Sequence, residues 1–314
     1  MDVQSLIENS FDDTKELKVL TNLLISRNFS QESYVHALEI NSVLKKIKTD
    51  FQKTNLPWKR NMIQQLNLKV SESSLKDWFL GRASISFFEL KKIAMLGGKR
   101  EYANILKNCS YFCTKTSSPV RFPKYILGDL AWVVAAILCD GHMRKNREGI
   151  AFEVGDELLA QKFSTKFASL FEVQEKKPRP IDRIGRNRTY SIEFCNIAAM
   201  LFLGVIFEVP FGRKSSLIQV PNIILGSNKK IKQAFLKGVF ETDGGKRGGG
   251  LGLTSLSESF IDEVNVLLRE FGVTPNKEAW LNKRYDKKCF GSRFKIDAYS
   301  MFLLRQKLSF CKNP

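Results

Sequence analysis

The sequence has no long uninterrupted apolar segment. Within its 314 residues, no apolar run is long enough and free enough of charge to span a bilayer, and the first ten residues, MDVQSLIENS, are acidic and polar. A transmembrane helix needs about 20 largely apolar residues, and a signal peptide needs a basic start followed by an apolar stretch. We therefore expect a cytoplasmic protein with no membrane partner.

Histidine is scarce, and the cysteines are not paired in the sequence. The six cysteines lie among apolar neighbours, and His36 and His142 stand at no recognised zinc-binding spacing. This pattern favours free thiols in a reducing compartment. The glycine cluster at 244–250, GGKRGGG, lacks the strand and helix that flank a phosphate-binding loop. We therefore expect no small-molecule cofactor.

Acidic residues are outnumbered by basic ones. The sequence has 50 Lys and Arg against 32 Asp and Glu, which gives a formal net charge of +18. Residues 1–120 hold 18 basic and 12 acidic residues, so +12 of this excess follows residue 120. Such a charge favours a polyanionic partner. Nucleic acid is the usual one, and an anionic membrane surface is the alternative.

Residues 1–113 have the pattern of a helical domain. Short apolar segments bounded by Ser and Gly predict three helices at about 57–97, joined by tight turns. This arrangement resembles a repressor-type helix-turn-helix, which would offer Ser73, Ser74 and Lys76 to bases. The alternative is a helical bundle that only packs on the main domain. Residues 114–123, TKTSSPVRFP, have linker composition and mark the predicted boundary.

The most informative stretch is 235–245, FLKGVFETDGG. Its apolar residues have helical spacing, Gly238 leaves room for a second backbone, and the glycines at its end stop the helix. Glu241 and Asp243 stand in the last turn, where the helix dipole disfavours acids unless a cation is near. A similar stretch at 133–141, VVAAILCDG, also ends in Asp-Gly. Two such copies at domain spacing indicate an internal duplication.

The residues that follow each motif support this duplication. The expected elements are strands at 149–154 and 251–254 and helices at about 158–171 and 260–271. Each of these helices leads into a basic segment of β character and then into another apolar helix. The predicted order in each repeat is therefore α-β-β-α-β-β-α, with repeat 1 at 124–228 and repeat 2 at 229–314.

The two motifs resemble those of the LAGLIDADG (DOD-type) homing endonucleases, in their single-chain form with two motifs. The second copy matches the leucine, the first glycine, the sixth-position acid and the final Asp-Gly, whereas the first copy has Ala135 and Leu138 at the glycine and acid positions. The resemblance implies a monomeric α/β (α+β) fold with pseudo-two-fold αββαββα repeats. An all-α N-terminal domain would precede it here.

In this family the last acid of each motif is the metal ligand, which assigns that role to Asp140 and Asp243. Small residues in both motif helices would let them pack closely and bring the carboxylates together, where Mg²⁺ or Mn²⁺ would offset their repulsion. Lys214 matches a family lysine that precedes a Pro-containing strand and reaches the scissile phosphate. The position equivalent to Lys214 falls beyond Pro314, so repeat 2 lacks its own equivalent unless Lys307 or Lys312 substitutes or a strand residue such as Lys295 takes the role. Glu241 resembles a structural acid, so the predicted catalytic set is Asp140, Asp243 and Lys214.

The basic β segments correspond to the family's DNA-binding strands, which lie in the major groove and contact phosphates and base edges. For each single residue, a solvated surface charge is the alternative role. The residues with this predicted role are Lys176, Lys177, Arg179, Arg183, Arg186, Arg188, Tyr190, Lys283, Arg284, Lys287, Lys288, Arg293 and Lys295.

Together these features predict a site-specific endonuclease that hydrolyses phosphodiesters of double-stranded DNA with a divalent metal held between Asp140 and Asp243. The main alternative is a DNA-binding transcription regulator on the same scaffold that has lost cleavage, and an RNA-splicing maturase is another. Neither end of the sequence shows splice-junction residues. We therefore expect a free-standing or intron-encoded enzyme of a mobile element, and not an intein fragment.

Overall fold

The structure is a computed structural model that describes residues 36–38, 41–52, 57–80, 82–83, 85–96, 111–113, 118–123, 125–144, 149–247, 250–282 and 287–295. The main division of the chain falls between residues 125 and 126, which separates an N-terminal from a C-terminal compact unit. The predicted apolar helix that ends repeat 2 lies outside the described residues.

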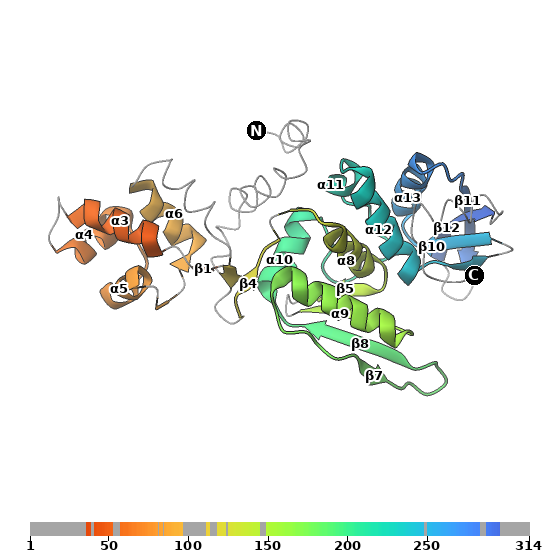
Figure 1. The fold of residues 1–314 in the computed structure, drawn as a ribbon, viewed down its shortest axis with the longest axis horizontal. Coiled ribbons are helices and arrows are strands. Elements are labelled where there is room, and N and C mark those ends of the chain that lie inside the picture. The colour runs from red at the N-terminus through yellow and green to blue at the C-terminus, as the bar shows by residue number, and fades with distance from the viewer. Residues whose placement is uncertain are drawn as a thin grey trace. The chain divides into compact units, whose positions relative to one another are not determined.

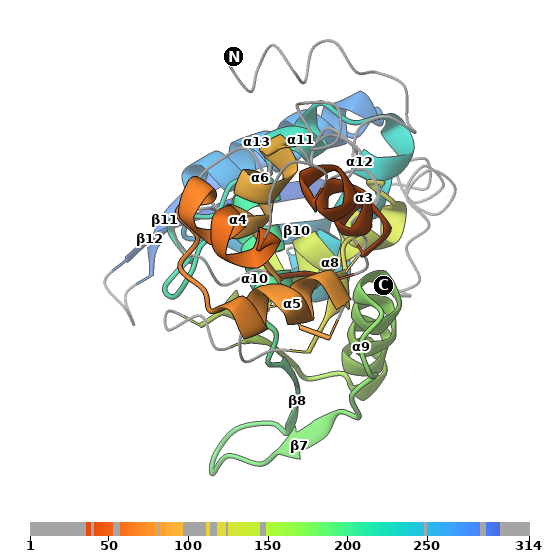
Figure 2. The same ribbon diagram turned by 90° about the vertical axis from the view of Figure 1, so that its left-hand side faces the viewer.

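The N-terminal unit is mainly helical (Figures 1 and 2). Its helices are α3 (Asn41–Gln52), α4 (Trp58–Leu66), α5 (Glu72–Leu80) and α6 (Phe87–Leu96). Trp58 packs edge-on against Phe79, with the ring centroids 5.2 Å apart. Ser71 caps α5, because its Oγ accepts a hydrogen bond from the Ser74 backbone N–H at 3.1 Å. Helices therefore form in the three places where the sequence predicts them between 57 and 97.

The same unit also contains a small sheet, which corrects the prediction of an all-α domain. Its strands are β1 (His36–Leu38), β2 (Ile85–Ser86), β3 (Tyr111–Cys113) and β4 (Val120–Arg121), in the order β2-β1-β3-β4. Strands of two or three residues are too short to show the alternation of apolar and polar side chains that identifies a strand. Since β4 pairs with β3, part of the predicted linker at 114–123 is sheet.

The C-terminal unit consists of two repeats in tandem. Repeat 1 contains α8 (Gly128–Cys139), β5 (Gly141–Met143), β6 (Ile150–Val154), α9 (Glu157–Phe171), β7 (Arg179–Ile181), β8 (Thr189–Phe194) and α10 (Ile197–Ile206). After the short helix α11 (Asn222–Leu225), repeat 2 contains α12 (Lys229–Thr242), β9 (Gly245–Arg247), β10 (Gly250–Ser255), α13 (Glu258–Glu270), β11 (Asn276–Asn282) and β12 (Lys287–Lys295).

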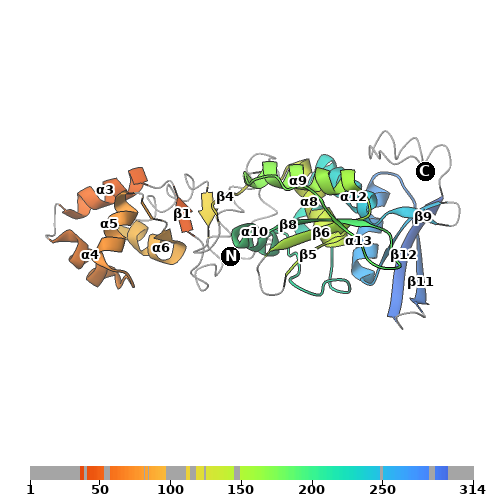
Figure 3. The same ribbon diagram turned by 90° about the horizontal axis from the view of Figure 1, so that it is seen from below.

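The two repeats have one topology. Their sheets are antiparallel and have the orders β5-β6-β8-β7 and β9-β10-β12-β11, so that the long hairpin lies at the same edge in both. Figure 3 shows the elements of the two repeats from below. This correspondence confirms the predicted α/β duplication, complete to α10 in repeat 1 and to β12 in repeat 2.

Aromatic packing fixes each sheet to its helices. Asp156 caps α9 by accepting hydrogen bonds from the backbone N–H groups of Leu158 and Leu159. On the buried face of α9, Phe163 stacks on Phe152 of β6 at 4.3 Å between ring centroids, and Phe167 stacks on Phe194 of β8 at the same distance. Rings packed in this way form the core of repeat 1 and set the direction of its hairpin.

Candidate active site

The site is built on the two motif helices, which pack side by side (Figure 1). Every residue of α8 from Leu130 to Leu138 is buried, which explains its nearly continuous apolar sequence. Gly238 of α12 is the point of closest approach. A Cβ atom there would lie 2.7 Å from the Ala135 Cβ and 2.8 Å from the Trp132 carbonyl oxygen. The missing side chain therefore allows the helices to approach closely and brings their C-terminal ends together.

Asp140 and Asp243 occupy equivalent positions directly after these helices. Their backbone angles are nearly identical, with φ −93° and ψ −11° at Asp140 and φ −89° and ψ −7° at Asp243. Each backbone N–H donates to the carbonyl four residues earlier, at 3.1 and 3.0 Å. The two carboxyls are close enough for a hydrogen bond, which one of them can donate only when it is protonated, so the structure brings together the two acids that the sequence singled out.

The environment of the aspartates disfavours two negative charges. Burial raises the pKa of Asp243, and hydrogen bonds with Cys139 and Asp140 together with the charge of Lys214 oppose that rise only in part. Both carboxyls also stand at the carbonyl ends of helices, where the dipole repels anions. A cation placed between them would relieve this cost.

Lys214 is the third predicted residue, and it is buried with 8% of its surface exposed. Its Nζ donates hydrogen bonds to the carbonyl oxygens of Leu138 and Cys139, the latter at 2.6 Å. Burial lowers the pKa of Lys214, while Cys139, Asp243 and Asp140 oppose this shift. The ammonium therefore stabilises the C-terminal end of α8 beside Asp140.

The segment that carries Lys214 differs from its prediction. The family resemblance implies a Pro-containing strand after the lysine, but residues 215–217 form a turn and Pro221 starts α11. Proline has no N–H to donate to a sheet and its fixed φ suits the start of a helix, which explains the difference. The turn is closed by the backbone N–H groups of Leu217 and Ile218, which donate to the Lys214 carbonyl at 2.7 and 3.0 Å.

Cys139 is a member of the site that sequence reasoning gave no side-chain role. Burial and the charge of Asp243 raise the pKa of its thiol, so it remains protonated and can donate to Asp243. Its position directly before Asp140 is the only sequence signal that could have identified it.

The two aspartates fit a hard divalent cation. Carboxylate oxygens are the ligands that Mg²⁺ prefers, and Mg²⁺ is usually held by one or two carboxylates while it keeps several waters. The raised pKa of Asp243 indicates that Lys214 alone does not compensate the pair. Among the described residues, no cluster of three or more His, Cys, Asp or Glu side chains has the geometry of a metal site.

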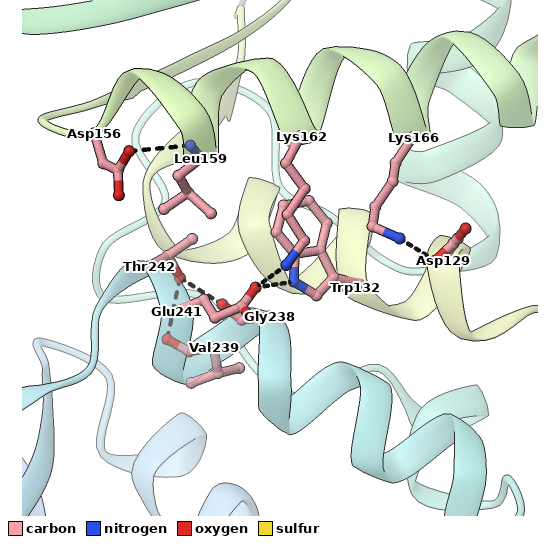
Figure 4. A network of polar contacts seen from close by, with 10 residues as sticks. All are labelled: Asp129, Trp132, Asp156, Leu159, Lys162, Lys166, Gly238, Val239, Glu241 and Thr242. Atoms are coloured by element: carbon pink, nitrogen blue, oxygen red, sulfur yellow. Dashed lines mark hydrogen bonds and ion pairs between the residues drawn. The ribbon is translucent and has the colours of Figure 1, made fainter. Parts of the chain in front are cut away.

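Glu241 is not part of this pair; it is buried and belongs to the network of polar contacts that Figure 4 shows. Its Oε2 accepts hydrogen bonds from Trp132 Nε1 at 2.7 Å and from Lys162 Nζ at 2.5 Å. The Lys162 ammonium also lies 4.8 Å from the centre of the Trp132 ring. Lys166 lies over the same ring at 5.8 Å and pairs with Asp129. Glu241 thus joins α12 to α8 and α9, and this agrees with its exclusion from the catalytic set.

Sequence reasoning missed Trp132 and Lys162 as the partners of Glu241. The signal was indirect: an acid in the last turn of a helix requires a nearby cation, but nothing in the sequence says which one.

The predicted DNA-contact residues fall into two groups. Lys176, Lys177, Arg179, Arg186 and Lys288 have exposed side chains. By contrast, Arg183 pairs with Glu153, Arg188 with Asp182 and Arg293 with Glu278. Tyr190 is half-buried in β8 and hydrogen-bonds with Arg188. Lys283 and Arg284 lie outside the described residues, and of Lys287 and Lys295 the structure describes only the backbone in β12.

The predicted helix-turn-helix residues lie at the start of α5 and on its exposed face. Ser73 and Lys76 are exposed and Ser74 is half-buried. The hydroxyls of Ser73 and Ser74 lie 2.8 and 3.0 Å from Ser71 Oγ, so both take part in the cap of α5. Lys76 takes no part in this cap, so its predicted role as a base or phosphate contact does not compete with the capping hydrogen bonds.

Comparison with known proteins identifies part of the chain. Residues 230–296 match the family model of the LAGLIDADG-like domain. The chain is 27% identical over 180 residues to the replication factor C small subunit of Methanocaldococcus jannaschii, which covers 55% of this chain and 9% of that protein. It is 33% identical over 98 residues to the probable translation initiation factor IF-2 of the same organism, which covers 30% of this chain and 8% of that protein. The chain thus spans less than a tenth of the length of either relative.

Solved structures with a similar arrangement include two kinds of protein. One is the homing endonuclease I-DmoI in complex with DNA and Mn, with a TM-score of 0.40 and 15% identity over 60% of this chain and 99% of that chain. Another is full-length DUF199/WhiA from Thermatoga maritima, with a TM-score of 0.40 and 9% identity over 59% of this chain and 56% of that chain.

The fold and the family match together define the class. The C-terminal unit is a duplicated α/β domain organised around two packed motif helices. Residues 230–296 of its second repeat match the LAGLIDADG-like domain, which confirms the resemblance that the motif at 235–245 predicts. In the part of the chain that the structure describes, no helix is both long and apolar enough to cross a membrane.

Proposed function

We propose that the C-terminal unit is a DNA endonuclease that hydrolyses phosphodiesters at a specific duplex site, with Mg²⁺ or Mn²⁺ as its cofactor. The observation that carries this proposal is the contact between the Asp140 and Asp243 carboxyls at the ends of two helices. Two half-buried acids in contact cost stability unless they bind a cation or share a proton. Two helix ends that served only the fold would gain nothing from this destabilising pair of acids.

Each residue of the site has its own role in this proposal. Asp140 and Asp243 would hold the cation, and Cys139 orients the Asp243 carboxyl through its thiol. Lys214 keeps the end of α8 in place and supplies a buried ammonium near both acids. A divalent cation bound here supplies positive charge at the scissile phosphate and lowers the pKa of a bound water. The exposed lysines and arginines of the hairpins would bind the phosphate backbone.

The test is cleavage of a randomised duplex DNA library by the full chain, with Mg²⁺ and with Mn²⁺. Asp140→Asn and Asp243→Asn keep the shape of the side chain and remove its charge. Asp129→Asn is the matched control, because Asp129 lies at the other end of α8 and is exposed. We expect discrete cuts by the wild type and by the control, and none by the two site variants. Cutting by Asp140→Asn or Asp243→Asn at the wild-type rate would contradict the assignment of that residue.

A DNA-binding regulator without cleavage is the second candidate. One observation favours it: the Lys214 ammonium is engaged by two main-chain carbonyls and so is not directed at a substrate. In the same library experiment, salt-sensitive retention of duplex DNA without any cutting would support the regulator. Retention of structured RNA alone would indicate instead the splicing role that the resemblance also allows.

A further inference from the structure

The hairpin of repeat 1 ends in a loop with an apolar residue at its apex. Ile184 is 106% exposed, more than any other large apolar side chain among the described residues. It is followed by Gly185, which has φ +72°, and the Arg186 backbone N–H donates to the Arg183 carbonyl at 3.1 Å. Ile184 and Gly185 are thus the two central residues of a tight turn in which only glycine takes the second position without strain. The turn holds the Ile184 side chain out into solvent.

Side-chain pairs hold this loop in one shape. At its base, Arg188 makes two hydrogen bonds to Asp182, from Nε at 2.7 Å and from Nη2 at 3.2 Å. Arg183 makes a second forked pair with Glu153 of the neighbouring strand, at 2.5 and 2.9 Å. Two forked pairs on one short loop reduce the conformational freedom that a partner would otherwise have to remove. The loop is therefore preorganised for binding.

The charge around the loop selects the partner. Residues 176–188 contain six Lys and Arg and one acid, Asp182. Figure 2 shows the β7–β8 ribbon projecting from α9 and the rest of its repeat. An apolar tip on a basic ribbon is complementary to duplex DNA, whose major groove is about 12 Å wide and admits a two-stranded ribbon. The apolar group that base edges present in that groove is the thymine C5 methyl.

We propose that Ile184 is a specificity residue that contacts a thymine methyl group in the major groove of the DNA site. This inference rests on the proposed DNA-binding function, which it deepens. The basic residues of the ribbon contact phosphates and give affinity without sequence preference. Ile184 adds a preference for thymine at one base pair, because only there does its apolar surface find an apolar partner.

The experiment removes the thymine methyl group on one side of the contact and the Ile184 side chain beyond its Cβ atom on the other. Binding of the full chain to its selected duplex is measured without divalent cation, with each thymine replaced in turn by deoxyuridine. For the wild type we expect one position at which this replacement weakens binding about fourfold, the change that corresponds to burial of one methyl group. For Ile184→Ala the same replacement should have no effect, which is the coupling that a direct contact requires.

Controls separate this inference from the proposed function. Leu158→Ala removes another highly exposed apolar side chain of repeat 1, on α9, and should respond to deoxyuridine as the wild type does. Because Ile184 is fully exposed, Ile184→Ala should keep the wild-type Tm. Duplex binding in which no thymine is coupled to Ile184 would overturn this inference and leave the proposed function standing. A fluorescence rise of 2-aminopurine at the contact would overturn it in favour of a wedge between bases. Failure to select any duplex would reject both proposals.

Discussion

The ends of α8 and α12 present the same aspartate geometry but are stabilised in different ways. At the end of α8, the Lys214 ammonium binds the main-chain carbonyls of Leu138 and Cys139. At the end of α12, the stabilising contacts go through a side chain, because Glu241 accepts hydrogen bonds from Trp132 and Lys162. Each helix end therefore has a lysine, supplied by a different element and bound to a different kind of acceptor.

The difference follows from one position of the motif. Leu138 and Glu241 both stand two residues before the aspartate of their repeat. An acid there adds negative charge to the negative end of the helix dipole and needs a cation of its own, whereas a leucine adds none. Repeat 1 can thus lose the motif acid without losing the geometry of its aspartate, as long as Lys214 occupies the carbonyl end. The weaker first motif is then no sign of a weaker site.

Removal of the Lys162 contact with Glu241 at the end of α12 should have the largest effect on stability. Lys162→Met leaves the Glu241 carboxylate buried and hydrogen-bonded to Trp132 but without the Lys162 ammonium, and loss of one partner of a buried ion pair costs about 3–5 kcal/mol. Because the Lys162 side chain is 33% exposed, we expect the lower end, about 3 kcal/mol, in urea unfolding.

The matched control for that variant is Lys166→Met. Lys166 lies on the same helix and over the same Trp132 ring, but its partner Asp129 is 59% exposed. Exposed pairs contribute about 1 kcal/mol or less, so the control should lose less than about 1 kcal/mol. Equal losses in the two variants would mean that the lysines act through the tryptophan ring and not through Glu241.

The packing of the two helices is the next contrast to test. Repeat 2 has Gly238 where repeat 1 has Ala135, and the two residues face each other. Gly238→Ala should destabilise the protein by about 2 kcal/mol, because overpacking costs 1–3 kcal/mol and exceeds the gain of up to about 1 kcal/mol in helix propensity.

Exchange of the two residues sharpens this test. The double variant Ala135→Gly/Gly238→Ala removes the clash with the Ala135 Cβ but not the one with the Trp132 carbonyl. We therefore expect only partial recovery of the free energy of unfolding relative to Gly238→Ala alone. Full recovery would show that the carbonyl contact relaxes freely.

The sequence predicted the elements of the C-terminal unit because each signal was local. The two Asp-Gly ends, the helical spacing before them and the basic hairpins all lie within short stretches, so the duplication could be predicted from the chain alone. It also predicted that Asp140 and Asp243 meet, since two helices that pack through small residues bring equivalent ends together. The N-terminal sheet escaped prediction because its strands of two or three residues are too short to show a recognisable alternation of apolar and polar side chains.

The contacts that stabilise the site could not be predicted in the same way. Lys162 is 79 residues from Glu241, and Lys214 is 75 residues from Cys139. Which of 50 basic residues reaches a given acceptor depends on the packing of α9 and on the turn after Lys214. Similarly, the pairing of Arg183 with Glu153 of β6 and of Arg293 with Glu278 of β11 depends on strand register, whereas Arg188 pairs with Asp182 within its own loop. These three arginine side chains are exposed as well as paired, so their role in DNA contact stays a prediction.

Removal of the lysine at the α8 end should cost less than removal of its counterpart at α12. In Lys214→Met the carbonyls of Leu138 and Cys139 lose a charge-assisted donor, but the desolvation that lowers the pKa of Lys214 is relieved as well. A cation at a helix C-terminus contributes about 1 kcal/mol, and we expect a loss of that size in urea unfolding. DNA cleavage should nevertheless be lost. A loss of stability as large as that of Lys162→Met would contradict the comparison of the two ends.

The smallest effect should be a gain in stability when the acid of repeat 2 is neutralised. Burial raises the folded pKa of Asp243 above its unfolded value, so the folded state favours the protonated carboxyl. Its contribution is therefore most favourable below the unfolded pKa, about 3.9, and is lost as the pH rises through the folded pKa. Asp243→Asn removes this pH dependence, so in EDTA the variant should have a slightly higher Tm than the wild type at pH 7 and the advantage should vanish towards pH 4.

Divalent cation should reverse the order of the two proteins. Mg²⁺ that binds only the folded wild type raises its Tm by mass action, while Asp243→Asn has lost one of the two ligands and should respond little. A thermal melt of both proteins at pH 7, with EDTA and with increasing Mg²⁺, therefore measures two quantities. The melt in EDTA gives the destabilisation by the paired acids, and the melt in Mg²⁺ gives the stabilisation by a bound cation. If the variant is less stable than the wild type in EDTA at pH 7, the charge of Lys214 already stabilises the two acids. The argument that they need a cation, which supports the nuclease proposal, would then fail.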